Sequence, residues 1–155
     1  MAHIFIDPSS LLKQYIREKG SDSVRSLIAS PTTETIFVAE IALAEVAAVI
    51  AAKRRAPGGI SDGMRQRILT RFLFDCKERY VLVKTDRPII DRAVTLSQQY
   101  RLRGYDAVQL ATALSLQAIF DSQVSNPMEL ICVASDLDLL VAASAERMTT
   151  LNPSQ

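Results

Sequence analysis

The stretch RLRGYDAVQLATAL, residues 101–114, decides the fold because it places one acid at the start of an almost entirely apolar helix. After Gly104 and Tyr105, apolar residues occur on nearly every side of the predicted helix, which is typical of a helix buried within a domain. Asp106 lies in its first turn, where free backbone N–H groups and the helix dipole favour an ionised carboxylate by ~0.3–1 kcal/mol. Helix capping therefore accounts for Asp106 taken alone, and Arg103 is a candidate ion-pair partner.

The composition is that of one globular domain. Of its 155 residues, 48% are hydrophobic, and the net charge is +1. A chain of this size buries a substantial core, so we expect one domain over residues 1–151 and a tail at residues 152–155. The balanced charge argues against broad coating of nucleic acid, which needs many phosphate-neutralising Lys and Arg residues. A local basic patch is still compatible with it.

Cysteine, histidine and hydropathy patterns exclude several classes of protein. Cys76 and Cys132 lie in apolar runs, which suits reduced, buried thiols in the cytoplasm better than a disulfide framework. The one histidine, His3, lies in a predicted strand with no acid beside it, which argues against Ser-His-Asp catalysis. No signal peptide is visible, and Glu40 and Glu45 interrupt the longest apolar run. We therefore expect a cytoplasmic protein without a membrane segment.

Short apolar strands alternate with helices along almost the whole chain. The predicted strands are residues 3–6, 35–38, 80–83, 130–133 and 148–151. The helices between them are predicted around residues 11–16, 21–28, 39–55, 61–73, 86–96, 106–121 and 136–143. In the helix after Asp86, Ile90 and Val94 are expected to face the core. This alternation predicts an α/β domain with a mostly parallel central sheet that helices cover on both faces.

Three more acids lie at the ends of predicted elements or on a helix face, and two of them resemble Asp106 in position. Asp7 follows the first strand and precedes Pro8, and Asp136 follows the fourth strand and precedes an apolar helix. An N-cap role accounts for either residue taken alone. Asp138 competes with Asp136 for a role in a site, but it lies two residues further into the helix.

Glu45, the third of these acids, is not explained by capping. Its neighbours three and four residues away are Ile41, Ala42, Ala48 and Val49, which predicts an apolar helix face without a basic partner. A buried unpaired charge must be protonated, paired or bound to a metal ion. The alternative to a role in a site is a Lys or Arg partner from a distant part of the chain.

The four acids are expected to converge at one rim of the sheet. In this class of fold, ligands bind beyond the carboxyl ends of the strands, where Asp7 and Asp136 lie. Close carboxylates repel one another, and a hard cation with oxygen ligands relieves the repulsion. Because the chain has no Cys/His cluster, we expect Mg²⁺ or Mn²⁺ rather than Zn²⁺. Such an ion would serve the hydrolysis of a phosphodiester bond.

Four pieces of the sequence resemble the motifs of the PIN-domain nucleases, and within that family the VapC-type ribonuclease toxins of toxin-antitoxin pairs. IFIDPSSLLKQYI resembles the first motif and places its metal-binding acid at Asp7 and a nearby hydroxyl group at Ser9. IALAEVAAVI resembles the second motif, with its acid at Glu45. LRGYDAVQLATAL and CVASDLDLLVAA resemble the third and fourth motifs, with acids at Asp106 and Asp136.

This resemblance implies an α/β/α sandwich and a Mg²⁺- or Mn²⁺-dependent endoribonuclease whose RNA products carry a 5′-phosphate. It also implies frequent homodimerisation and inhibition by a small VapB-like antitoxin that blocks the acidic cleft. Asp7 and Asp106 would hold the principal metal ion, and Glu45 and Asp136 would act through water or complete a second site. Ser9 would orient the attacking water or a carboxylate.

Two residues depart from the family pattern. Pro8 and Ala134 stand where the family usually has a hydroxyl residue, and the second departure bears on the assignment of Asp136.

Rival functions are also compatible with the sequence. A receiver-like enzyme or an acidic-pocket phosphatase would need a nucleophilic Asp and a Lys at a later strand end, for which Lys84 is the candidate. A catalytically silent PIN-fold binding module and a housekeeping PIN nuclease without an antitoxin are further rival functions.

A set of basic residues on two of the predicted helices is the candidate surface for RNA phosphates. Each member is equally consistent with a solvated helix surface. The set comprises Lys53, Arg54, Arg55, Arg65, Arg67 and Arg71.

Overall fold

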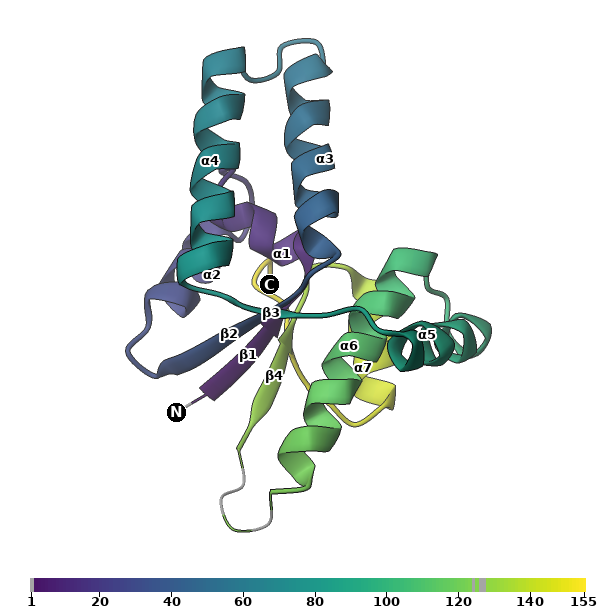
Figure 1. The fold of residues 1–155 in the computed structure, drawn as a ribbon. Helices are drawn as coiled ribbons and strands as arrows, with labels where there is room; N and C mark the ends of the chain where they lie inside the picture. Colours follow the sequence, from purple (N-terminus) through teal and green to yellow (C-terminus); the bar gives the residue numbers. More distant parts are fainter. Residues whose placement is uncertain (1, 124, 126–127) are drawn as a thin grey trace.

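A parallel five-stranded sheet forms the centre of the computed structural model, which describes residues 2–123, 125 and 128–155 (Figure 1). The strands are β1 (Ala2–Ile6), β2 (Thr33–Ala39), β3 (Val81–Val83), β4 (Leu130–Val133) and β5 (Thr149–Leu151). Their order across the sheet is β3-β2-β1-β4-β5, and every neighbouring pair is parallel. The predicted α/β fold with a parallel sheet is confirmed.

Helices cover both faces of this sheet (Figure 1). In chain order they are α1 (Pro8–Leu11), the 3₁₀ turn η1 (Leu12–Gln14), α2 (Ser21–Ala29), α3 (Ala42–Arg55), α4 (Asp62–Glu78), α5 (Arg87–Gln99), α6 (Gly104–Asp121) and α7 (Leu137–Ala145). One hydrophobic core joins α1 to α4 to one face, and a second joins α5, α6 and α7 to the other. The paired helices α3 and α4 rise from the sheet, and we call them the helical arm.

The pleat of β1 divides its side chains between the two cores. Ile4 and Ile6 are buried in the core under α1 to α4, whereas Phe5 is buried in the core under α5 to α7. Successive side chains of a strand point to opposite faces, so a strand covered on both sides must be apolar throughout. This is why HIFI reads as a continuous apolar run rather than an alternating one.

Helix α6 is buried along most of its length, as its sequence predicts. Leu110 and Ala113 are inaccessible to solvent, and the helix packs against α5, α7 and the sheet. The apolar residues on all sides of α6 are therefore explained by neighbours on several sides. This packing fixes the start of α6, and with it Asp106, relative to β1 and β4.

Three details differ from the sequence-based expectation. Strand β2 continues to Ala39, which pairs with Val83 of β3, so α3 begins only at Ala42. The helix predicted near residues 11–16 is a short α-helix followed by a 3₁₀ turn. In α5, Ile90 and Val94 are 38% and 60% exposed, so the inward position predicted for them is wrong.

The last residues of the chain pack against the turn before α2. Pro153 is buried, and its carbonyl oxygen would lie 2.8 Å from a Cβ atom placed on Gly20. The proposed boundary between a domain at residues 1–151 and a tail stays a prediction. No helix in the described part of the chain is long and apolar enough to cross a lipid bilayer.

Gly59 closes the turn at the tip of the helical arm. A Cβ atom at this position would lie 1.9 Å from the carbonyl oxygen of Lys53, which accepts a hydrogen bond from the backbone N–H of Ile60. A side chain therefore forces the turn to open and breaks this hydrogen bond. We expect Gly59→Ala to lower the free energy of unfolding by ~2–3 kcal/mol in urea denaturation.

Gly63→Ala is the matched control for that measurement. Its Cβ atom would meet nothing closer than a nitrogen of the Arg67 side chain at 3.6 Å, and Gly63 lies in the first turns of α4. Because alanine is the better helix former, we expect this variant to gain ~0.5–1 kcal/mol at most. Equal stability of the two variants would contradict the close approach at Gly59.

Candidate active site

All four predicted acids line one pocket beyond the carboxyl ends of β1 and β4. The pocket has a volume of about 300 Å³. The chain leaves β1 toward β2 on one side and reaches β4 on the other, so the strand order reverses at this pair of strands. The lining residues are Asp7, Pro8, Ser9, Leu12, Glu45, Val46, Val49, Arg103, Asp106 and Asp136.

Asp7 is the most buried of the four acids, with 3% of its surface exposed. Its carboxylate accepts hydrogen bonds from the backbone N–H of Ser9 at 2.9 Å and from the hydroxyl group of Ser9 at 2.8 and 2.9 Å. Burial raises the pKa of Asp7 from 3.8 to about 7, against the effect of the Ser9 hydrogen bonds, and the charges of Asp106 and Glu45 add to the rise. The ionised form of Asp7 is therefore destabilised by its surroundings, and a nearby cation would stabilise it.

Ser9 connects Asp7 to the loop after β4. Its hydroxyl oxygen accepts a hydrogen bond from the backbone N–H of Ser135 at 3.0 Å while the hydroxyl proton is directed at Asp7. The hydroxyl groups of Ser10 and Ser135 are 2.9 Å apart and also share a hydrogen bond. These contacts hold the segments carrying Asp7 and Asp136 together. The role of Ser135 was not predicted, although its position directly before Asp136 was a usable signal.

Glu45 lies on the wall that α3 contributes to the pocket. It is half-buried rather than fully buried, and Val49, one turn further along α3, is 40% exposed. Its carboxylate accepts a hydrogen bond at 3.0 Å from the side-chain amide of Gln109 on α6. Burial raises the pKa of Glu45, the Gln109 hydrogen bond lowers it, and the charge of Asp106 raises it. Within the described residues no Lys or Arg nitrogen lies within 4.0 Å of Glu45, so the alternative of a distant basic partner is not seen.

Asp106 is the third residue of α6, after the N-cap residue Arg103. Burial raises the pKa of Asp106, and the charge of Asp136 adds to the rise. A backbone hydrogen bond from Arg103 and the positive charge of its side chain act in the opposite direction. Asp106 thus stabilises the start of α6, as a third-position acid does in a capping box, and also lines the pocket.

Asp136 also combines a cap with a place in the pocket. One of its carboxylate oxygens accepts the backbone N–H of Leu139 at 2.9 Å, which caps α7. Asp138 lines a neighbouring hollow instead, and its carboxylate is 3.7 Å from the guanidinium group of Arg101. Of these two competing acids, the structure places Asp136 in the acid pocket.

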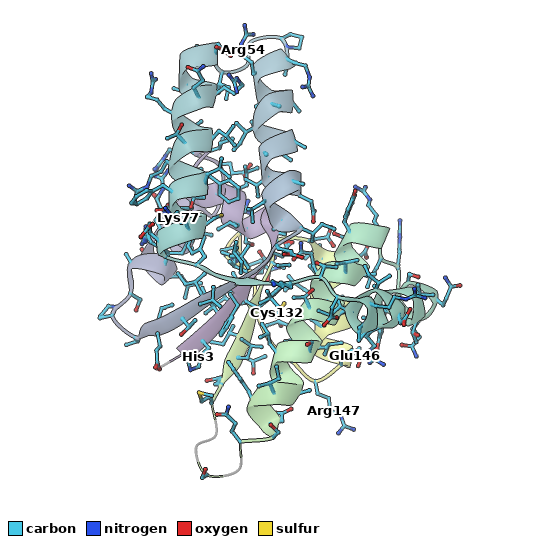
Figure 2. The ribbon with its side chains drawn as sticks, viewed as in Figure 1. His3, Arg54, Lys77, Cys132, Glu146 and Arg147 are labelled. Carbon is cyan, nitrogen blue, oxygen red and sulfur yellow. The ribbon has the colours of Figure 1, made fainter. Side chains whose placement is uncertain are left out.

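The basic residues proposed as phosphate contacts do not line the acid pocket. They lie on the helical arm, with Arg54 at its tip, far from the sheet, while Lys77 marks its base (Figure 2). Lys84, the lysine that a receiver-like enzyme would need, does not line the pocket either. Arg103 is the one basic residue among the lining residues described.

His3 lies at the end of β1 opposite to the acid pocket (Figure 2). The expectation that no acid lies beside it is wrong, because Glu34 of β2 approaches its ring nitrogen at 3.7 Å. Its ring also packs edge-on against Phe120. Since this pair is remote from Ser9 and Asp7, no Ser-His-Asp arrangement results.

The donor atoms of the pocket suit a hard cation. Asp7, Glu45, Asp106 and Asp136 offer carboxylate oxygens only. Behind them lies Gln109, which donates to Glu45 and whose buried side-chain oxygen has no hydrogen-bond partner in the described part of the protein. In the described part of the chain, no three Asp, Glu, His or Cys side chains lie close enough together to hold one metal ion without water. Mg²⁺ keeps several of its waters in proteins and needs few direct carboxylate ligands, so a spaced oxygen set fits it.

The family model of the PIN domain matches residues 4–126. The chain belongs to the PIN domain family. Its motifs resemble the nucleases of this family, and the family predicted from them is confirmed. Comparison with curated proteins found no match.

Solved structures with the same fold include components of toxin-antitoxin systems. FitAcB from Neisseria gonorrhoeae is 16% identical, with a TM-score of 0.64 over 97% of each chain. VapC20 from Mycobacterium tuberculosis, described as a sarcin-ricin loop cleaving toxin, is 14% identical, with a TM-score of 0.65 over 90% of this chain and 94% of that one. A toxin-antitoxin complex from Klebsiella pneumoniae is 19% identical, with a TM-score of 0.59 over 97% of each chain. At these identities the likeness shows that this PIN domain shares their fold.

The raised pKa of Asp7 makes the stability of the metal-free PIN domain depend on pH. Between the unfolded value of 3.8 and the folded value of about 7, the folded state keeps a proton that the unfolded state releases. Stability is therefore lost as the pH rises through this window, and the loss is complete above it. Since one pKa unit corresponds to ~1.4 kcal/mol, we expect Asp7→Asn to raise the free energy of unfolding by ~2–4 kcal/mol at about pH 8.

Urea denaturation in the presence of a chelator measures this effect across the pH range. The gain from Asp7→Asn should shrink toward zero only as the pH falls below the unfolded pKa of 3.8, because the native carboxyl group is then protonated in both states. Asp91→Asn, at an exposed ion pair with Arg87, is the control and should show no such gain. An Asp7→Asn protein that is less stable than the wild type at high pH would contradict the raised pKa of Asp7.

Proposed function

We propose that this PIN domain is a divalent-metal-dependent endoribonuclease and the toxin of a toxin-antitoxin pair. The observation that carries the proposal is the meeting of four carboxylates in one pocket, two from the N-caps of α1 and α7 and two from α3 and α6. Their residues are far apart in sequence, and burial raises the pKa of three of them. Such a cluster is unfavourable for stability by itself and is explained by a cation that binds there.

Each acid has a role that follows from how it is held. Asp7 and Asp106 would bind the principal ion, and Glu45 and Asp136 would complete the site directly or through water. When bound, a divalent ion would lower the pKa of water and neutralise charge on the phosphate that is cut. Ser9 would keep the Asp7 carboxylate in one orientation through its backbone N–H and its hydroxyl group, which both donate to it.

Gln109 and the caps supply the remaining orientation. The side-chain amide of Gln109 fixes one oxygen of Glu45, and the capping bond to Leu139 fixes one oxygen of Asp136. The other oxygen of each carboxylate is then free to act in the site. Carboxylates that are already held in place lose little conformational entropy when they bind an ion.

The choice of RNA as substrate and of an antitoxin as partner rests on the family motifs and on the proteins that share the fold. VapC20 is a sarcin-ricin loop cleaving toxin, and the Klebsiella pneumoniae structure is a toxin-antitoxin complex. We propose that a small VapB-like antitoxin covers the acid pocket of this chain. The motif resemblance also supports a homodimer. The rival functions are a housekeeping nuclease without an antitoxin and a catalytically silent binding module.

Cleavage of labelled RNA in Mn²⁺, in Mg²⁺ and in excess chelator tests the enzyme. We expect cleavage with either ion, none with the chelator, and products with a 5′-phosphate. Because even second-shell groups at metal sites cost ~10–100-fold when they are mutated, Asp7→Asn and Asp106→Asn should each lower the rate more than ~100-fold. Glu45→Gln should fall in the ~10–100-fold range, and the exposed control Asp91→Asn should match the wild type.

The outcomes separate the rival functions. Cleavage that survives the chelator or Asp7→Asn would contradict the metal site. A wild-type protein that cuts RNA under no metal condition would indicate a binding module. Expression in a bacterial host tests the toxin: growth should stop with the wild-type chain and continue with Asp7→Asn, whereas unimpaired growth despite cleavage in vitro would favour a housekeeping nuclease.

A further inference from the structure

A second hollow adjoins the acid pocket. Its volume is about 370 Å³, and it shares three lining residues, Arg103, Asp106 and Asp136, with the pocket. Its remaining wall includes Arg101 and Asp138. The acid pocket and the second hollow therefore lie side by side, with Arg103 in the wall that they share, and we call the two together the cleft.

Arg103 is the only basic side chain, among the residues described, that lines both parts of the cleft. Arg101 lines the second hollow alone, and its charge is directed to Asp138 at 3.7 Å. For Arg103, no carboxylate lies within 4.0 Å in the described part of the chain. A residue kept only to neutralise Asp106 would pair with it directly, as Arg65 pairs with Asp62 at 2.8 Å.

Backbone groups beside Arg103 add to the positive potential at this shared wall. Arg103 is the N-cap of α6, and its side chain makes no capping hydrogen bond. The first N–H groups of an α-helix have no partner within the helix and carry the positive end of its dipole. The charge of Arg103 and the positive end of the dipole of an 18-residue helix thus both add positive potential beside the cleft.

We propose that Arg103 is a substrate-positioning residue that binds the RNA phosphate next to the one that is cut. The proposal rests on the nuclease function proposed above. The phosphates of an RNA strand are regularly spaced anions. When the phosphate that is cut lies at the four acids, the adjacent phosphate lies close to them as well and needs a cation. A guanidinium group has a permanent charge and five donors that match the oxygens of a phosphate. Arg103 would bind the strand where the two hollows meet, and its charge would offset the repulsion between the acids and the RNA phosphates.

Binding of RNA without cleavage tests this role directly. The probe is a short fluorescein-labelled single-stranded RNA of mixed sequence, with the Asp7→Asn protein in chelator, measured by fluorescence anisotropy over a range of salt concentrations. A charge-assisted hydrogen bond contributes ~1.5–3 kcal/mol, so adding Arg103→Met should raise Kd by about tenfold or more. The slope of log affinity against log salt should fall by ~0.7, the value for one phosphate contact on a single strand.

Two further variants make the result specific. Arg103→Lys keeps the charge and should restore the salt slope while recovering only part of the affinity, because lysine lacks the planar fork. Arg87→Met removes one charge from an exposed ion pair on α5 and should leave both quantities unchanged. A salt slope that does not change in Arg103→Met, or that changes equally in Arg87→Met, would overturn the proposal.

Kinetics on active protein distinguish positioning from a structural role. With Mn²⁺ and an RNA that the wild type cuts, Arg103→Met should raise KM about tenfold and change kcat far less. A lower kcat at unchanged KM would overturn the assignment and indicate that Arg103 acts on the acids instead. These results differ from a failure of the proposed function, in which the wild-type protein cuts no RNA with any ion.

Discussion

The burial of the Asp7 carboxylate among other acids, at the carboxyl ends of β1 and β4, is the constraint on which the rest of the structure depends. Asp7 lies at the end of a strand buried on both faces, where burial raises the pKa of its carboxyl group to about 7. Glu45 and Asp106 lie close enough to add their charges to this effect. A PIN domain optimised for stability alone would have an amide or an apolar residue at position 7. The arrangement is intelligible as a site that keeps negative charge ready for a cation, at a cost in stability.

The scaffold holds these charges by giving most of them a second, structural task. Asp7 accepts the N–H of Ser9 at the start of α1, Asp136 caps α7, and Asp106 lies in the first turn of α6. Capping and a role in the site are therefore not alternatives for these residues, because the start of each helix fixes the direction of its acid. Glu45 lies in the first turn of α3 without a capping bond, and the amide of Gln109 supplies its orientation across the pocket.

Local patterns in the sequence predicted the strands, the helices and the four acids, because each depends on periodicity or on position within its own element. The buried strand β4 and the helix α6 follow directly from their apolar residues. Features that depend on partners from other elements were missed. Strand β2 runs on to Ala39 because β3 pairs with it, and Gln109 and Ser135 acquire their roles only when α3 meets α6 and the loop after β4 meets Ser9. Ile90 and Val94 have the helical spacing of core residues, yet the face of α5 that carries them has no neighbour in the described chain that buries it.

The location of bound metal tests the central claim most directly. Crystals of the wild-type PIN domain grown with Mn²⁺, and measured at a wavelength where manganese scatters anomalously, would show where the ion binds. We predict an anomalous peak in the acid pocket, bonded to the carboxylates of Asp7 and Asp106 and absent from crystals of Asp7→Asn. An empty acid pocket at a Mn²⁺ concentration that supports full RNA cleavage, or a peak confined to other acids such as Asp138, would contradict it.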